Sequence, residues 1–294
     1  MMIAVSGANG FTGRFVCAEL QRRQQVFVAV LRPGTDVNWM KTHHIPVRFA
    51  DLNDVQQLTS ALSGCSVLLN VASIGFGSAP FIVQSCRLAG LKRVVFVSTT
   101  AIFTQLNAGS KAVRQAAESV INSSDLDFTI LRPTMIYGTP GDRNMIRLVR
   151  WLDRLPVLPV FGNGRSLQQP VHVTDVAWAV VEAAMTTAAI GCSFNLSGSV
   201  AVTYNEVVQL TALALGKKVY RIHLPCGIIV ACLQMLEHLH LELPIKSEQI
   251  RRLNENKAFS HEDAFLAFGY DPISFDQGIL NEVKLFRSGP EVWE

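Results

Sequence analysis

Three glycines near the start of the chain have the spacing of a loop that binds the phosphates of a dinucleotide. They follow a short apolar run over residues 3–5 and precede a helix predicted over 14–23. In such a loop one glycine permits a tight turn, one lets the backbone approach a pyrophosphate, and one allows close helix–strand packing. The start of the helix supplies N–H groups and positive dipole to the phosphates. The expected cofactor contacts from this loop are Gly7, Asn9, Gly10, Phe11 and Gly13.

The residue at the end of the second predicted strand indicates which dinucleotide is bound. An NAD site places an acid about 20 residues beyond the loop to hold the ribose 2′-OH, whereas an NADP site places a cation there for the 2′-phosphate. Arg32 occupies this position, Arg14 is a candidate second cation, and Asp36 lies beyond the Pro33-Gly34 turn. The alternative is that Arg32 is a solvated charge at the end of a strand. We favour the phosphate role, so NADP is the expected cofactor and NAD the less favoured one.

The elements that must position these residues alternate between short β-rich runs and longer helical patterns. The runs are almost wholly apolar, as strands buried on both faces should be. Strand–helix–strand repetition at this spacing predicts an α/β fold, a Rossmann-type doubly wound parallel sheet with a smaller, mostly helical C-terminal substrate lobe. The predicted strands span 3–5, 26–31, 47–49, 67–71, 94–97 and 128–131, and the predicted helices span 14–23, 55–62, 81–89 and 110–122.

The pattern changes after Pro133, where proline and glycine become frequent. Helices are predicted over 144–155 and 176–185, short strands over 170–173 and 193–196, and a mostly helical remainder from 204 to about 287. We therefore expect two interleaved lobes. The dinucleotide-binding domain covers 1–140 and regains 170–198, and the substrate-binding lobe covers 141–169 and 199–294.

Composition excludes several classes of protein. The 294 residues are 49% hydrophobic and 17% charged, which suits a globular chain with a large core. The chain has 26 Lys and Arg against 23 Asp and Glu, too balanced to indicate a nucleic-acid or membrane partner. The six cysteines form no C-x-x-C pair, and no basic residue precedes the glycine loop, so we expect reduced thiols, no signal peptide and a cytoplasmic location. His238 and His240 lack further ligands nearby in sequence, so no metal site is expected.

Six further segments follow the glycine loop in a fixed order. They are Asp51-Leu52, Asn70-Val71-Ala72-Ser73, Val97-Ser98-Thr99-Thr100, Leu131-Arg132-Pro133-Thr134-Met135-Ile136-Tyr137-Gly138, Pro170-Val171-His172-Val173-Thr174-Asp175-Val176-Ala177 and Phe268-Gly269-Tyr270-Asp271-Pro272-Ile273-Ser274-Phe275. In this order they resemble the short-chain dehydrogenase/reductase superfamily, most of all its extended or atypical branch, which contains the NAD(P)-dependent nucleotide-sugar epimerases and dehydratases. The resemblance covers essentially the whole chain, and the order of the motifs is more specific than any one of them.

The resemblance implies roles for residues on the cofactor side. Asp51 would accept a hydrogen bond from the adenine amino group, and Leu52 would pack on the ring. Ala72 and Ser73 would lie along the ribose and diphosphate, and the stretch from Pro133 to Ile136 would border the nicotinamide. On the substrate side, where such enzymes hold a nucleotide diphosphate, the implied contacts are Asn144, Gly162 and His172.

The resemblance fails at the usual catalytic tyrosine. Family members normally carry a Y-x-x-x-K pattern, with a Ser or Thr that orients the substrate oxygen. Here Asn107 stands at the tyrosine position before Lys111, and none of the four tyrosines precedes a lysine at that spacing. An asparagine cannot donate and recover a proton near neutral pH, so catalysis by the usual tyrosine is excluded. Thr100 and Lys111 remain as the expected catalytic residues, with Lys111 also a cofactor contact.

Two functions stay open on the sequence. The first is an NADP(H)-dependent oxidoreductase or epimerase-like protein that acts on a nucleotide-linked sugar or a related carbonyl or hydroxyl substrate. The second is a catalytically inactive NADP-binding scaffold or redox sensor. Thr100 and Lys111 favour the enzyme, which we expect, and Asn107 favours the scaffold. The expected partner is a small-molecule substrate, with a nucleotide sugar in first place, and a homodimer is left open.

Overall fold

In a computed structural model the chain is described for residues 1–106, 109–238 and 247–289. It divides into two compact units. Unit 1 combines Met1–Thr134, Val173–Leu196 and Ser260–Asp271, and unit 2 combines Met135–His172, Ser197–Phe259 and Pro272–Glu294. The backbone therefore crosses between the units several times. The sequence analysis did not separate Ser260–Asp271 from the C-terminal lobe, whereas the structure places it in unit 1.

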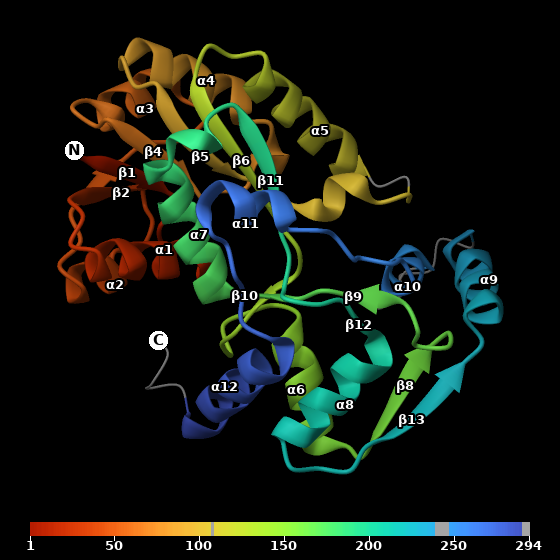
Figure 1. Cartoon of the computed structure of the whole chain (residues 1–294). Helices are drawn as coiled ribbons and strands as arrows, with labels where there is room; N and C mark the ends of the chain where they lie inside the picture. Colours follow the sequence, from red (N-terminus) through yellow and green to blue (C-terminus); the bar gives the residue numbers. More distant parts are fainter. Residues whose placement is uncertain (107–108, 239–246, 290–294) are drawn as a thin grey trace. The chain divides into compact units, whose positions relative to one another are not determined.

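Unit 1 is built on a seven-stranded parallel sheet, which Figure 1 shows in the upper half of the view. The strand order is β11-β6-β5-β4-β1-β2-β3. The α/β, Rossmann-type prediction is confirmed, and each of the six strands predicted before Pro133 is present. The strands are β1 (Ile3–Ser6), β2 (Phe27–Leu31), β3 (Val47–Phe49), β4 (Val67–Asn70), β5 (Arg93–Val97), β6 (Asp127–Pro133) and β11 (Cys192–Leu196).

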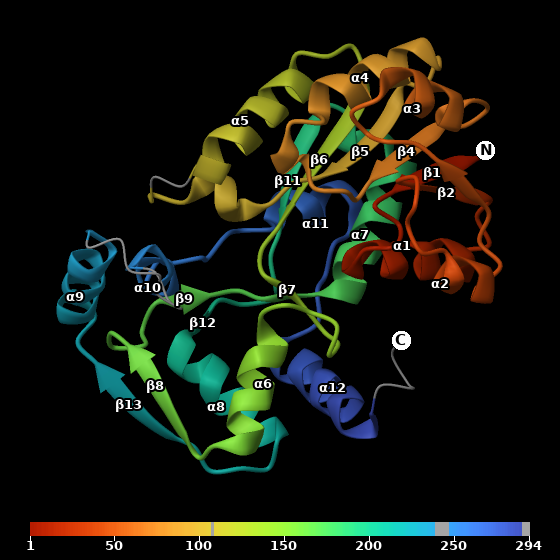
Figure 2. The same ribbon diagram turned by 180° about the vertical axis from the view of Figure 1, so that it is seen from behind.

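Helices cover both faces of this sheet (Figures 1 and 2). One face carries α3 (Val55–Leu62), α4 (Ala79–Leu88) and α5 (Gly109–Asn122), and the other carries α1 (Phe11–Arg22) and α7 (Val173–Met185). Apolar side chains of α3, α4 and α5 meet those of the central strands in one continuous core. Burial on both faces explains why the strands read as unbroken apolar runs. The short helices α2 (Asn38–Thr42) and α11 (Glu262–Phe268) complete the unit.

The strand order reverses direction beside β1. From β1 the chain adds β2 and β3 on one side of the sheet, then returns to add β4, β5 and β6 on the other. Ser6 at the end of β1 lies in register with Val30 of β2 and Asn70 of β4. In open parallel sheets, ligands bind outside the carboxyl ends of the strands at such a switch point. The loops after β1 and β4 are therefore where a ligand of unit 1 is expected.

Unit 2 consists of helices packed around short strand pairs. Its core joins side chains of α6, α8 and α12 with those of β8. The pairs are β7 (Ile136–Tyr137) with β10 (Val171–His172), β9 (Leu167–Gln168) with β12 (Val202–Thr203), and β8 (Val157–Phe161) with β13 (Tyr220–Leu224). The helices are α6 (Met145–Arg154), α8 (Tyr204–Ala214), α9 (Cys226–His238), α10 (Ser247–Leu253) and α12 (Phe275–Ser288).

β13 corrects the prediction of a mostly helical remainder after residue 204. It pairs in parallel with β8, from Tyr220 opposite Val157 to Leu224 opposite Phe161. The strand is almost wholly exposed, so no buried alternation marks it in the sequence, and pairing with β8 decides its conformation.

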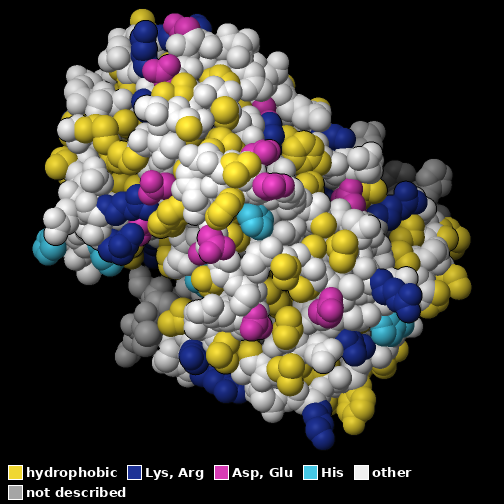
Figure 3. Space-filling view, viewed as in Figure 1, with side chains coloured by type: hydrophobic (Ala, Val, Ile, Leu, Met, Phe, Trp, Pro, Cys, Tyr) yellow, Lys and Arg dark blue, Asp and Glu magenta, His cyan; other side chains and the backbone are white. Residues whose placement is uncertain are grey.

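Two surface properties bear on partners. On the face drawn in Figure 3, lysine and arginine side chains are interspersed with aspartate and glutamate. None of the helices in the described part of the chain has the length and hydropathy of a membrane-spanning segment.

Candidate cofactor and substrate sites

The glycine loop lies at the switch point, and two of its glycines are required by close backbone contacts. Gly7 has φ +71°, and a Cβ on it would lie 2.5 Å from the backbone nitrogen of Ala72. A Cβ on Gly13 would collide with the Gly7 carbonyl oxygen and lie 2.8 Å from the backbone of Ala8. The first contact presses the loop after β1 onto the loop after β4, and the second lets α1 approach the end of β1.

Gly10 differs from these two because an added Cβ would make one tight contact and no collision. Its φ of −75° is accessible to any residue, and within 4 Å an added Cβ would meet only the Gly7 carbonyl oxygen, at 3.2 Å. Gly10 is also the N-cap of α1, and its residue type supplies no side-chain cap. The first turn of α1 therefore presents backbone N–H groups toward an open position, which fits the pyrophosphate of a dinucleotide.

A short hydrogen-bond chain holds the two loops at this point. Ser6 Oγ donates to Asn70 Oδ1 at 2.7 Å, and Asn70 Nδ2 donates to the Ala72 carbonyl at 3.0 Å. Ser6 and Asn70 are fully buried. Ser73 Oγ accepts from the Gly75 N–H at 3.2 Å and so caps the 3₁₀ helix Ile74–Phe76. Ala72 and Ser73 thus lie beside the glycine loop, where the resemblance implies ribose and diphosphate contacts.

Arg32 lies exposed at the end of β2, and no other side chain in the described part of the chain pairs with it. Its carbonyl accepts from the Thr35 N–H at 3.1 Å, and Gly34 adopts φ +81° in the turn between them. The carboxylate of Asp36 accepts from the Asn38 N–H at 2.9 Å and so serves the start of α2. The carboxylate of Asp36 is thereby used locally, whereas the Arg32 guanidinium is available to a ligand.

Arg14 is held in place beside the loop. Its Nε and Nη2 donate to Asn9 Oδ1 at 3.3 and 3.2 Å, and its guanidinium lies 5.2 Å from the ring centroid of Trp39. Asn9 Nδ2 donates to the Asp36 carbonyl at 3.0 Å, which ties the loop to the segment after β2. Trp39 carries no signal in the sequence for this contact, because only the fold brings residue 39 against residue 14.

Asp51 and Leu52 follow β3, at the same edge of the sheet. One carboxylate oxygen of Asp51 accepts from the Asn53 N–H at 2.9 Å, and the Asp51 N–H donates to Gln57 Oε1 at 3.2 Å. Leu52 is half-buried and packs against the core of unit 1. These contacts fix the segment to which the resemblance assigns the adenine.

The two expected catalytic residues come from neighbouring elements of unit 1. Thr100 begins the 3₁₀ helix Thr100–Phe103 after β5, is 7% exposed, and donates through Oγ1 to the Pro133 carbonyl at 3.3 Å. Lys111 lies in the first turn of α5 and donates through Nζ to the Thr104 carbonyl at 2.6 Å. Its amine is thereby attached to the end of that 3₁₀ helix. Asn107 lies outside the described residues.

A buried ion pair fixes α5 to the sheet and was not foreseen from the sequence. Glu118, 5% exposed, accepts from Ser98 Oγ at 2.5 Å and from Arg132 at 2.6 and 3.1 Å. The Arg132 guanidinium also lies 5.4 Å from the ring centroid of Phe103. Ser98 follows β5, Arg132 belongs to β6 and Glu118 stands two turns after Lys111. The pair therefore sets where the helix that carries Lys111 meets the end of β5.

The implied substrate residues of unit 2 have separate surroundings. His172 is buried beside Tyr137, with ring centroids 5.4 Å apart, and burial lowers the pKa of His172 to about 4, so the ring is neutral near pH 7. A Cβ on Gly138 would lie 2.6 Å from His172 Nε2.

Gly162 has φ +90° and lies against the side chain of Asn254. Asn144 is exposed just before α6. Packing within unit 2 thus accounts for the residue types at 162 and 172.

Unit 2 contains a cavity of about 430 Å³ that includes Asn144 but neither Gly162 nor His172. Its walls come from α6, β8, the end of α10 and the start of α8. The lining residues are Asn144, Arg147, Leu148, Trp151, Leu158, Pro159, Phe161, Gly164, Ser166, Tyr204 and Leu253. This volume lies in the range of small-molecule sites.

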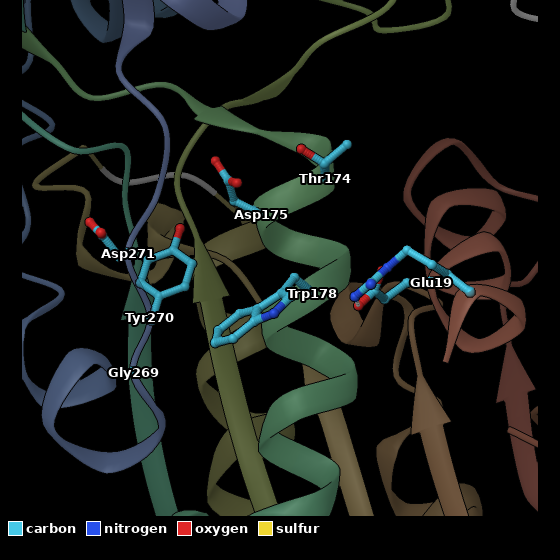
Figure 4. A pocket seen from close by; sticks show the side chains of 8 residues that line it. Glu19, Thr174, Asp175, Trp178, Gly269, Tyr270 and Asp271 are labelled. Carbon is cyan, nitrogen blue, oxygen red and sulfur yellow. Dashed lines mark hydrogen bonds and ion pairs between the residues drawn. The ribbon is translucent and has the colours of Figure 1, made fainter. Parts of the chain in front are cut away.

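A smaller hollow of about 300 Å³ lies in unit 1, away from the glycine loop (Figure 4). Asp175 and Trp178 lie on the side of α7 nearer to Tyr270, and Glu19 of α1 lies on the other side. Glu19 is already paired with Arg22 at 2.7 Å and Arg23 at 2.6 Å. Burial and the charge of Asp175 hold the pKa of Tyr270 well above its usual value, so this phenol stays protonated. The hollow contains none of the expected cofactor residues.

The geometry of unit 1 agrees with comparisons to known proteins. A family model described as NAD(P)H-binding matches residues 7–185, more than half of the chain. The chain belongs to this NAD(P)H-binding family. The expected NAD(P)-binding family is thereby confirmed.

Individual relatives are more distant. The chain is 26% identical to a 2-alkyl-3-oxoalkanoate reductase of Stenotrophomonas maltophilia, over 95% of this chain and 97% of that protein. It is 23% identical to the mitochondrial NADH dehydrogenase 1 alpha subcomplex subunit 9 of Arabidopsis thaliana, over 88% of this chain and 70% of that protein. It spans only 26% of the length of an uncharacterised Mycobacterium tuberculosis protein to which it is 26% identical.

Solved structures share the fold. A Thermus thermophilus UDP-glucose 4-epimerase in complex with NAD superposes with a TM-score of 0.75, over 99% of this chain and 100% of that one. The sequences are 20% identical, so this structural similarity supports the shared fold only.

Proposed function

We propose that the chain is an NADP(H)-dependent oxidoreductase that acts on a carbonyl or hydroxyl substrate. The observation that carries this proposal is the open position at Gly10, where the uncapped start of α1 faces the switch point of the sheet. A nicotinamide cofactor supplies hydride-transfer chemistry when bound. The residues that would hold it are the glycine loop from Gly7 to Gly13 with Asn9 and Phe11, then Arg32, Asp51, Leu52, Ala72, Ser73, Lys111, Pro133 and Ile136.

Replacing Gly10 with valine tests the cofactor site. We expect this variant to fold, since φ is ordinary and the one tight contact, with the Gly7 carbonyl oxygen at 3.2 Å, needs a shift of only a few tenths of an ångström. The valine side chain would fill the position that the pyrophosphate needs, so NADPH binding should fall below detection in calorimetry. Gly13→Ala is the contrasting variant, because its Cβ collides with backbone, and it should lower the melting temperature. Unchanged NADPH affinity in folded Gly10→Val would show that the loop is only a turn.

The choice of NADP over NAD rests on Arg32 and Arg14. A charge-assisted contact to the 2′-phosphate contributes about 1.5–3 kcal/mol, so NADPH should bind about tenfold or more tightly than NADH. Arg32→Asp should narrow or reverse that ratio, because a carboxylate repels the phosphate and accepts from a ribose hydroxyl. The control is Arg143→Asp, because Arg143 is an exposed arginine. Arg48 is unsuitable as a control, because it donates hydrogen bonds to two backbone carbonyls. Calorimetry in which the parent binds NADH as tightly as NADPH would contradict the assignment.

Two substrate classes are compatible with this chemistry. A nucleotide-linked sugar is the class that the resemblance implies, and a fold neighbour is a UDP-glucose 4-epimerase. A relative that spans nearly the same length is a 2-alkyl-3-oxoalkanoate reductase, whose substrate name denotes a carbonyl on an alkyl chain with a carboxylate. Both classes present a carbon that can exchange hydride.

A second candidate function is a dinucleotide-holding scaffold without turnover. The Lys111 amine already donates to the Thr104 carbonyl at 2.6 Å, and Asn107 replaces the usual proton donor. A further relative is named as a subunit of NADH dehydrogenase. Incubating the protein with NADPH and a panel of nucleotide sugars and 3-oxoalkanoates, and following absorbance of the reduced nicotinamide, separates the two functions.

A further inference from the structure

We propose that the cavity of unit 2 binds an alkyl or acyl chain that ends in a carboxylate, and not the nucleotide of a nucleotide sugar. The proposal rests on the proposed function, in that such a ligand would carry the carbonyl to be reduced.

The lining is dominated by large apolar side chains. Leu148 and Trp151 come from α6, Leu158, Pro159 and Phe161 from β8, and Leu253 from the end of α10. They surround about 430 Å³, enough for a drug-sized ligand. Moving methylene groups from water into such a space is favourable by about 0.8 kcal/mol each, which is about fourfold in affinity.

Several polar groups near the cavity are already satisfied by the protein. Trp151 Nε1 donates to the Val157 carbonyl at 2.9 Å, so the indole is held by its polar edge. Ser166 Oγ donates to the Leu253 carbonyl at 2.9 Å. A base, a ribose and a diphosphate together require many hydrogen-bond partners, and burying them unpaired is costly. The cavity lining leaves three side chains, those of Asn144, Arg147 and Tyr204, to pair with a ligand, fewer than a nucleotide needs.

Three side chains of the lining remain to bind a polar head, those of Asn144, Arg147 and Tyr204. Arg147 is exposed, and no other side chain of the described residues pairs with it. It stands one helical turn before Trp151, so both side chains lie on the same face of α6. Tyr204 also lines the cavity, its hydroxyl makes no hydrogen bond within the described part of the chain, and burial raises its pKa, so it stays a neutral donor. One guanidinium and one phenol match the two oxygens of one carboxylate.

The test is calorimetry with hexanoate, octanoate, decanoate and UDP on the whole protein. We expect affinity to rise about fifteenfold for each two added carbons until the cavity is filled. UDP should neither bind at millimolar concentration nor displace decanoate. An affinity that does not change with chain length, or displacement of decanoate by UDP, would overturn the proposal.

Paired variants locate the ligand. Leu253 and Leu280 are 41% and 42% exposed, and only Leu253 lines the cavity. Leu253→Asn should weaken decanoate binding at least fivefold, whereas Leu280→Asn should leave it unchanged. Arg147→Gln should remove the preference for decanoate over decanol, whereas Arg150→Gln, on the same helix but outside the lining, should not. Equal effects within either pair would count against this cavity.

A parallel NADPH titration keeps the two proposals distinguishable. Decanoate binding with the expected chain-length dependence but no NADPH binding would sink the oxidoreductase proposal and leave the cavity assignment standing. NADPH binding without any alkanoate binding would overturn the cavity assignment and leave the oxidoreductase proposal standing. Melting curves of each variant establish that it is folded.

Discussion

Turnover should fall by about a hundredfold or more when Lys111 is replaced with methionine, with a smaller loss of NADPH affinity. If Asn107 stands at the tyrosine position, as the motif spacing predicts, Lys111 is the one titratable side chain that remains from the usual catalytic set. Its ammonium would make the local field positive where negative charge develops on the substrate oxygen. The structure places it in the first turn of α5, a helix fixed to the sheet by the buried Glu118–Arg132 pair, so little reorganisation is needed.

Three variants make this expectation specific. Lys92→Met removes an exposed lysine elsewhere in unit 1 and should leave the turnover number unchanged. Thr100→Ala should cost less than Lys111→Met, because a threonine hydroxyl positions the substrate oxygen without titrating. Lys111→Arg keeps the charge and should retain more turnover than methionine. If turnover in Lys111→Met equals that of the parent, the catalytic role of Lys111 is wrong.

The fold was predictable because its signals are local. Apolar runs buried on both faces, the glycine spacing and the helical patterns between them are enough to predict a doubly wound sheet, and the structure confirms each predicted strand of the first half. Even the separate roles of three glycines follow from spacing, and contacts at Gly7 and Gly13 agree with them. By contrast, β13 carries no buried alternation, so only its partner strand β8 identifies it.

The surroundings of the site were less predictable because they depend on contacts between distant residues. Arg14 lies against Trp39, and Glu118 binds both Ser98 and Arg132. A buried charge needs a partner, but the sequence does not say which residue the packing will bring to it. The apolar cavity of unit 2 is a similar case, since Trp151, Phe161 and Leu253 come from three elements that each read as ordinary amphipathic or apolar segments.

A buried carboxyl pair in unit 2 leads to the other large expected effect. Glu282 of α12 is fully buried, and Asp142 is 6% exposed. Asp142 Oδ1 accepts from the backbone N–H groups of Asn144 and Ile146 at 2.6 and 3.3 Å, which holds it at the start of α6. Burial, followed by the nearby charge of Asp142, raises the pKa of Glu282 to about 10. Glu282 is therefore protonated in the folded protein at neutral pH.

This shift makes stability depend on pH in a definite direction. Above a pH of about 4.5 the unfolded chain loses the Glu282 proton, whereas the folded chain keeps it until about pH 10, so rising pH favours unfolding across that window. Glu282→Gln keeps the shape of the protonated acid and removes the titration. Between pH 6 and 9, the free energy of unfolding in urea should rise in the variant relative to the parent by about 1.4 kcal/mol for each pH unit. Glu262 is an exposed glutamate of α11, so in Glu262→Gln the free energy of unfolding should depend on pH as it does in the parent. Parallel curves for Glu282→Gln and the parent would mean that Glu282 is ionised in the folded state and that another group compensates its charge.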